Sequence, residues 1–170
     1  MIVAVIHGRA FRHLALAPGM SVLDVGCGSG RLSVQIARAV GPTGRVVGVD
    51  VDPKAVRTAV RRAEMSGLNN VRFLPLVFGE ATFDDDGFDR AVLVAVLGEM
   101  RNPPAAMAAA FRALKPEGAL AVTEVVLDPH RQKPDNVRRL AMLAGFEERE
   151  LFTDALAYTI TFRKPLPSNH

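Results

Sequence analysis

The sequence predicts an α/β fold of the doubly wound type, in which a seven-stranded sheet carries helices on both faces. Two observations predict it. From residue 21 to about 143, short apolar runs alternate with longer amphipathic stretches, which is typical of a parallel sheet covered on both sides. After Gly145, two β-rich runs, 146–152 and 156–162, are separated by only three residues, which favours an antiparallel hairpin. We therefore expect five parallel strands followed by this hairpin.

The first half of the chain supplies two strands and two helices. The first strand is expected at 21–25, and apolar residues near helical spacing then predict a helix over 31–40. The run Gly41-Pro42-Thr43-Gly44 ends this helix. The second strand, 45–50, is apolar enough to be buried on both faces. Pro53 opens the second helix in its first turn, where the missing N–H has no intrahelical partner to lose.

The second half continues the alternation up to the hairpin. Turn-forming residues separate each apolar run from the next amphipathic stretch. The expected elements are strands at 71–76, 88–96 and 119–127, and helices at about 103–114 and 135–144.

The 170 residues suit one domain, with an N-terminal helix or arm over 1–20, a core over 21–164 and a tail over 165–170. The composition, 49% hydrophobic and 23% charged, is that of a soluble globular protein. No apolar run reaches the roughly 18–20 residues that span a bilayer. The apolar start at 2–6 has no basic leader before it. We expect a cytoplasmic protein without a membrane segment.

Three residue types exclude classes of function. The single cysteine, Cys27, excludes an internal disulfide framework and a cysteine-rich zinc site. His7 and His13 have no cysteine or carboxylate at ligand spacing, so no metal site is expected. The chain has no tryptophan, and Tyr158 is its one tyrosine. This leaves little material for stacking on nucleic-acid bases and argues against a nucleic-acid partner.

The chain is mildly basic, with a net charge of +3. Its cations form either ordinary solvated helix faces or a patch for an anionic partner, and the sequence leaves both interpretations open. Much of the positive charge lies at Arg57, Arg61, Arg62, Arg131, Lys133, Arg138 and Arg139.

A glycine-rich segment, Asp24-Val25-Gly26-Cys27-Gly28-Ser29-Gly30, ends the first predicted strand. It predicts a tight turn into the next helix, because glycine adopts positive φ and lets a ligand or another backbone approach closely. The dinucleotide fingerprint spaces its glycines G-x-G-x-x-G. Here they fall as G-x-G-x-G, with an acid two residues before the first. This stretch resembles the first motif of the class I S-adenosylmethionine-dependent methyltransferases.

Further motifs follow in the order found in that family. Asp50 ends the second strand, where a carboxylate can accept hydrogen bonds from a ribose diol. The phrases at 88–92, 113–118 and 144–146 also look like family signposts. The resemblance covers roughly residues 18–164, and the chain looks like a small, type-11-like member related to the quinone-methylating type.

The resemblance implies a Rossmann-like fold with S-adenosylmethionine as cofactor. The glycine loop would hold the methionine end of the cofactor, and Asp50 its ribose. Many relatives carry an acid beside the adenine, where this chain has Val77 or Phe78. Phe78 can pack on the adenine face, and either a backbone group or Glu80 can take the place of the acid at the adenine amino group. The cofactor-binding residues that the resemblance implies are Asp24, Gly26, Cys27, Gly28, Gly30, Asp50, Val51, Val77 and Phe78.

Catalytic candidates are sought at the carboxyl ends of the strands, where ligands bind in open α/β sheets. The sulfonium methyl is already electrophilic, so the protein mainly aligns the nucleophile. A base is needed only if the nucleophile arrives protonated. Our hypothesis is that His130 is a base or substrate orienter, with Glu124 or Asp128 beside it. The alternative is a helix-entry turn, Asp128-Pro129, followed by a solvent-facing histidine.

A second motif, Asn102-Pro103-Pro104, is similar to the Asn-Pro-Pro-aromatic motif of amino-group methyltransferases. It lies 13 residues after Asp89, and Ala105 stands in place of the aromatic residue. We interpret the two prolines as a helix start.

The implied function is methyl transfer from S-adenosylmethionine to a small-molecule acceptor. Only 20 residues precede the first strand. The acceptor pocket is therefore expected to be shallow and open, or to be completed by a second subunit in a homo-oligomer. Two alternatives stay open: a methyltransferase-like binding or scaffold subunit without turnover, and an NAD-dependent oxidoreductase, which the glycine spacing disfavours.

Overall fold

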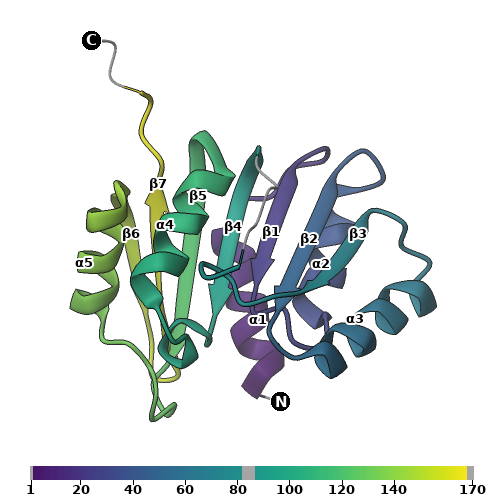
Figure 1. Ribbon diagram of the computed structural model, residues 1–170, viewed down its shortest axis with the longest axis horizontal. Helices are drawn as coiled ribbons and strands as arrows, with labels where there is room; N and C mark the ends of the chain where they lie inside the picture. Colours follow the sequence, from purple (N-terminus) through teal and green to yellow (C-terminus); the bar gives the residue numbers. More distant parts are fainter. Residues whose placement is uncertain (1, 82–86, 168–170) are drawn as a thin grey trace.

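A computed structural model describes residues 2–81 and 87–167 of the chain (Figure 1). One sheet holds its strands in the order β3-β2-β1-β4-β5-β7-β6. Residues 168–170 of the predicted tail lie outside the described residues. The strands are β1 (Ser21–Val25), β2 (Arg45–Asp50), β3 (Val71–Pro75), β4 (Phe88–Val94), β5 (Leu114–Val125), β6 (Glu147–Thr153) and β7 (Ala157–Arg163). The helices are α1 (Ile2–His13), α2 (Arg31–Val40), α3 (Pro53–Met65), the 3-10 turn η1 (Leu97–Glu99), α4 (Pro103–Ala113) and α5 (Pro134–Ala144).

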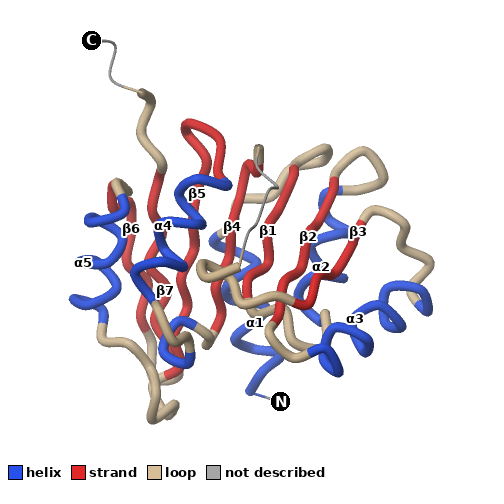
Figure 2. Tube along the Cα trace, viewed as in Figure 1, coloured by secondary structure: helices blue, strands red, loops and turns tan. Residues whose placement is uncertain are grey.

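The pairing of the strands confirms the predicted doubly wound fold. The first five strands pair in parallel. The last strand of the chain, β7, lies between β5 and β6 and is antiparallel to both, so the hairpin closes one side of the sheet (Figure 2). The strand order reverses between β1 and β4, which is the point where doubly wound sheets bind their ligands.

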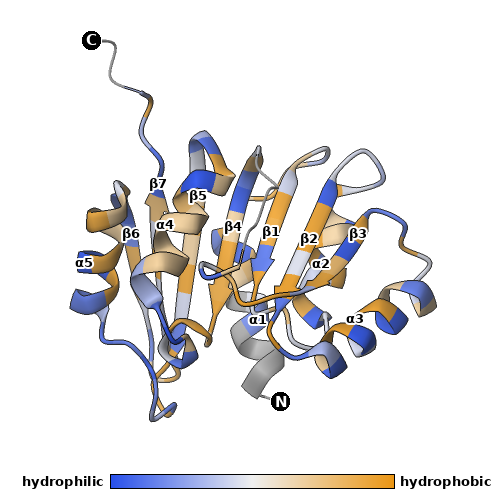
Figure 3. Ribbon diagram, viewed as in Figure 1, coloured by the Kyte–Doolittle hydropathy of each residue, from blue (hydrophilic) through white to orange (hydrophobic). Residues whose placement is uncertain are grey.

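Two apolar cores lie on opposite faces of the sheet. On one face, α1 and α2 pack over Val22, Val46 and Val92. On the other, α4 and α5 pack over alternate residues of the same strands, including Leu23 and Val47. Burial on both faces explains why apolar residues predominate in the central strands (Figure 3). No helix among the described residues is long and apolar enough to cross a membrane.

Several strand boundaries differ from the prediction, by one to five residues. Strand β4 ends at Val94 instead of residue 96, because Ala95 adopts a positive φ of 50°. Strand β5 begins at Leu114, five residues before the predicted start, because Leu114 pairs with Phe88 ahead of a register shift. The turn residues after it stay paired, since Glu117 N–H donates to the Lys164 carbonyl. Here distant strands decide the conformation of a segment whose composition is typical of a loop.

Candidate functional site

A cavity of about 290 Å³ opens at the carboxyl ends of β1 and β2. The turn after β3 and the segment after β4 complete its wall. Five of the residues predicted to bind the cofactor line this cavity: Gly26, Asp50, Val51, Val77 and Phe78. The remaining lining residues are Val25, Val49, Leu76, Glu80, Val96, Glu99, Met100, Arg101 and Asn102.

The glycine loop is anchored to β2 at one edge of this cavity. The backbone N–H groups of Gly26 and Cys27 both donate to the Val49 carbonyl, at 2.8 and 3.0 Å. Gly26, Gly28 and Gly30 all have positive φ, at 76°, 51° and 74°. This left-handed conformation is the reason why the segment uses glycine at alternate positions.

The three glycines have different neighbours. A Cβ at Gly26 would lie 2.5 Å from Val96 Cγ2, and one at Gly30 would lie 2.8 Å from Ala59 Cβ. A Cβ at Gly28 would have no heavy atom within 4 Å. The outer glycines therefore allow close packing, whereas Gly28 borders open space that a ligand can fill.

This difference predicts unequal costs of substitution. Gly30→Ala should lower the free energy of unfolding by about 2 kcal/mol, because backbone strain adds to overpacking against Ala59. Gly28→Ala introduces strain alone and should cost about 1 kcal/mol. Urea denaturation of both variants measures the two costs. Equal destabilisation would contradict the packing role assigned to Gly30.

Asp50 connects the glycine loop to the turn that starts α3. Its Oδ2 accepts from the Gly28 N–H at 2.8 Å, and its Oδ1 accepts from the Asp52 N–H at 2.9 Å. A carboxylate has about four lone-pair sites, so both oxygens keep acceptor capacity toward the cavity that Asp50 lines. Asp52 has the separate task of capping α3 by accepting from the Lys54 N–H.

Asp24 lies beneath the loop and does not line the cavity. It is 2% exposed and accepts a hydrogen bond from the buried Ser33 hydroxyl on α2. Burial raises the pKa of Asp24 to about 6, against the lowering effect of the Ser33 hydrogen bond. The contact ties the start of α2 to β1, and so supports the loop between them.

Cys27 is a packing residue of the loop. It is 7% exposed, and burial raises the pKa of its thiol well above the usual range. Since the thiolate is the reactive form of cysteine, the side chain is unsuited to act as a nucleophile.

The turn after β3 forms the wall at the predicted adenine position. Phe78 is 6% exposed and belongs to the core that α4 covers. Gly79 permits this, because a Cβ there would lie 2.5 Å from the Ala106 backbone nitrogen. Val77 and Glu80 line the cavity beside it, so this end combines apolar side chains with one carboxylate.

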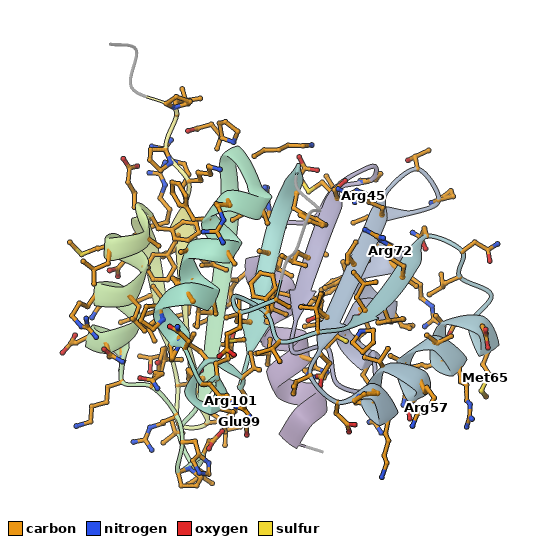
Figure 4. All side chains as sticks on the ribbon, viewed as in Figure 1. Arg45, Arg57, Met65, Arg72, Glu99 and Arg101 are labelled. Carbon is orange, nitrogen blue, oxygen red and sulfur yellow. The ribbon has the colours of Figure 1, made fainter. Side chains whose placement is uncertain are left out.

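The segment after β4 supplies one wall of the cavity, with the lining residues Val96, Glu99, Met100, Arg101 and Asn102. Figure 4 shows Glu99 and Arg101 close together near the carboxyl ends of the central strands. Asn102 Oδ1 accepts from the Ala105 N–H and caps α4, as expected of a helix start. Sequence spacing held no signal for Met100 or Arg101, because η1 positions them through tertiary packing.

Of the three catalytic candidates, Glu124 lies near the end of β5, and Asp128 and His130 follow the strand. None of the three is among the described residues that line the cavity. Asp128 Oδ1 accepts from the His130 N–H at 2.8 Å and lies 3.6 Å from the imidazole Nδ1. The His130 side chain is 69% exposed. Glu124 is 1% exposed; its Oε2 accepts from the Gln132 N–H at 3.1 Å. The structure thus pairs His130 with Asp128 and buries Glu124 beneath the same segment.

Comparison with known proteins places this site in a family. The model of a methyltransferase domain family matches residues 16–155. The 2-phytyl-1,4-naphtoquinone methyltransferase of Nostoc sp. is 34% identical over 128 residues, covering 75% of this chain and 53% of that protein. A ubiquinone/menaquinone biosynthesis C-methyltransferase of Shewanella pealeana is 32% identical over 114 residues, covering 66% and 45%. The chain spans about half the length of these curated relatives.

Solved structures show the same fold. A SAM-dependent methyltransferase from Aquifex aeolicus superposes with a TM-score of 0.84 at 22% identity, covering 93% of this chain and 89% of that one. The N-methyltransferase NodS from Bradyrhizobium japonicum, solved with S-adenosyl-l-homocysteine, gives 0.81 at 18% identity, covering 97% and 88%. With the matching domain, the glycine loop and Asp50 at its cavity, the chain belongs to the class I S-adenosylmethionine-dependent methyltransferases.

Proposed function

We propose that this chain transfers a methyl group from S-adenosylmethionine to a small-molecule acceptor. The observation that carries the proposal is the Asp50 carboxylate, which two backbone N–H groups hold at the edge of the cavity, next to the open side of Gly28. This arrangement offers acceptors for a ribose diol beside a backbone that a ligand can approach.

The residues present fit the cofactor. Gly28 leaves the backbone of the loop open to a ligand, because a Cβ there would meet no heavy atom within 4 Å. In the proposal the glycine loop holds the methionine end and Asp50 holds the ribose. Val77 and Phe78 pack against the adenine, with Val51 at its other side. Asp24 acts from below by anchoring α2 to the loop through Ser33.

When bound, S-adenosylmethionine supplies an electrophilic methyl group on its sulfonium. The protein then has to hold the acceptor in line with that methyl and keep competing water away, which can supply several kcal/mol of barrier lowering. Met100 and Arg101 line the side of the cavity formed by the segment after β4. We assign the acceptor to this side.

His130 is proposed as the base for an acceptor that arrives protonated. Asp128 holds the segment by accepting the His130 N–H and lies close enough to Nδ1 to orient the imidazole. His130→Ala should then lower kcat for a protonated acceptor about 100-fold and leave cofactor affinity unchanged. Unchanged turnover would show that Asp128 and His130 only form a helix-entry turn and have no part in catalysis.

The relatives suggest where to look for the acceptor. Two of them are named for quinone methylation, and the apolar side chain of Met100 lines the side of the cavity that we assign to the acceptor. A small aromatic acceptor such as a reduced naphthoquinone is therefore the first class to test.

Thermal melting with S-adenosylmethionine, S-adenosylhomocysteine and NAD, each added separately, tests the cofactor. A ligand at about 100 times its Kd stabilises by about 2.7 kcal/mol, which raises Tm by roughly 5–10 °C for a domain of this size. We expect the shift with the first two ligands alone. Stabilisation by NAD alone would support the oxidoreductase instead.

Methyl transfer itself is tested with labelled S-adenosylmethionine and a panel of quinols, phenols and small amines, analysed by mass spectrometry. Incorporation of label into one class of acceptor supports the proposal. Cofactor binding without label in any acceptor would favour the scaffold subunit.

A further inference from the structure

A second hollow, of about 360 Å³, lies between α2 and α3, next to α1. Its lining includes His7 of α1, Arg31 and Arg38 of α2, and Arg62 of α3. It shares no lining residue with the cofactor cavity. The hollow gathers part of the positive charge that the sequence leaves without a role.

The described residues give the cations of this hollow no counter-charge. Its described lining residues include no carboxylate. In the described part of the chain, none of its three guanidinium groups forms an ion pair with a carboxylate. Burial, and after it the charge of Arg31, lowers the pKa of His7, so a protonated His7 and Arg31 would repel one another. A bound anion would relieve this repulsion.

The spacing on α2 indicates the size of the anion. Arg31 and Arg38 are seven residues apart, so they lie on one helix face about 10 Å apart along the axis. Val34 and Gln35 form the floor between them. A single phosphate would engage one end of this row, whereas two linked phosphates can reach guanidinium groups from both ends. Arginine is suited to this, because its planar fork binds phosphate oxygens in pairs.

We propose that the hollow between α2 and α3 binds a diphosphate group, either as free pyrophosphate or as part of a small organic diphosphate. Arg31 and Arg38 bind the anion from α2, and Arg62 binds it from α3. His7 adds an N–H donor from α1. The assignment of the anion does not depend on the methyl-transfer reaction.

The hollow is also connected to the glycine loop. Arg62 Nε donates to the Ser29 carbonyl at 2.7 Å, and Arg31 directly follows Gly30. A diphosphate that binds these two arginines would restrain the glycine loop through its last residues, Ser29 and Gly30. We therefore expect diphosphate to raise the affinity for S-adenosylhomocysteine several-fold. S-adenosylhomocysteine should then raise the affinity for diphosphate by the same factor. This coupling, unlike the anion binding, rests on the proposed function.

Calorimetric titration with pyrophosphate tests the anion site in the wild type, Arg38→Gln and Arg57→Gln. Arg57 is the matched control, because it is an exposed arginine of α3 outside the hollow (Figure 4). We expect Arg38→Gln to raise the Kd for pyrophosphate about tenfold, the equivalent of one charge-assisted hydrogen bond, and Arg57→Gln to leave it within twofold. Circular dichroism confirms that both variants are folded.

The outcomes separate this site from general surface charge. Equal weakening in both variants, or no binding by the wild type, would overturn the proposal. Binding of RNA with no binding of pyrophosphate would assign the arginines to a polyanion instead and would also overturn it. Titration with geranyl diphosphate, an organic diphosphate, against pyrophosphate then distinguishes the two sources of the group. Pyrophosphate binding without any S-adenosylhomocysteine binding would support the anion site while contradicting the proposed function.

Discussion

Asp50→Ala is expected to lower the affinity for S-adenosylhomocysteine about 100-fold without unfolding the protein. The variant loses the carboxylate that accepts from Gly28 and Asp52 and that we assign to the two ribose hydroxyls. Hydrogen bonds to a charged group contribute about 1.5–3 kcal/mol each, so the loss amounts to about 3 kcal/mol in binding free energy, or roughly 100-fold in Kd. Calorimetric titration measures it directly.

Asp52→Ala is the matched control for this variant. It removes the same charge two residues further on, from an exposed side chain that caps α3 and lies outside the cavity lining. Loss of the cap should lower the free energy of unfolding by about 1 kcal/mol and leave the Kd within about twofold. If both variants weaken binding equally, net charge decides the affinity. If neither does, the ribose lies elsewhere.

The parallel part of the fold could be predicted because its signal is local. Strands β1 and β2 are buried on both faces and therefore consist of short apolar runs, whereas helix boundaries are set by residues such as Pro53. The start of β5 could not be predicted in this way. Its first residues pair with Phe88 and Lys164, which are remote in sequence.

Only the part of the candidate site that lies in a single sequence motif could be predicted. The glycine spacing and Asp50 point to the edge of the sheet at which the cavity opens. The spacing could not separate Gly28, which borders open space, from Gly30, which is packed against Ala59. Nor could it predict Arg101, whose place in the wall depends on how η1 packs after β4.

Glu124→Gln is expected to change how stability depends on pH. Glu124 is 1% exposed, and by the geometric criterion its Oε1 accepts no hydrogen bond from the described residues. Burial raises its pKa to about 7, from an ordinary value of 4.5. The backbone N–H of Gln132 opposes this shift, whereas Asp128 and Glu99 add to it. The protonated carboxyl is therefore the form that the folded protein favours.

The sign follows from comparing the two states. Below about pH 4.5, Glu124 is protonated whether the chain is folded or unfolded, and its contribution to stability is fully present. Between pH 4.5 and 7 the unfolded chain ionises first, so stability falls as the pH rises. The loss for this one group amounts to about 3 kcal/mol. Asp24, whose pKa is raised to about 6, adds a further decrease in the free energy of unfolding over an overlapping pH range.

Glutamine keeps the shape of Glu124 and an oxygen for the Gln132 N–H but cannot ionise. Glu124→Gln should therefore match the wild type near pH 4.5 and exceed its free energy of unfolding by about 2–3 kcal/mol at pH 8. Urea denaturation from pH 4.5 to 8 measures both curves, with Glu150→Gln as the exposed control on β6. Parallel curves for Glu124→Gln and the wild type would show that this carboxyl ionises outside the range. A flatter curve would show that the folded protein favours the neutral form of Glu124.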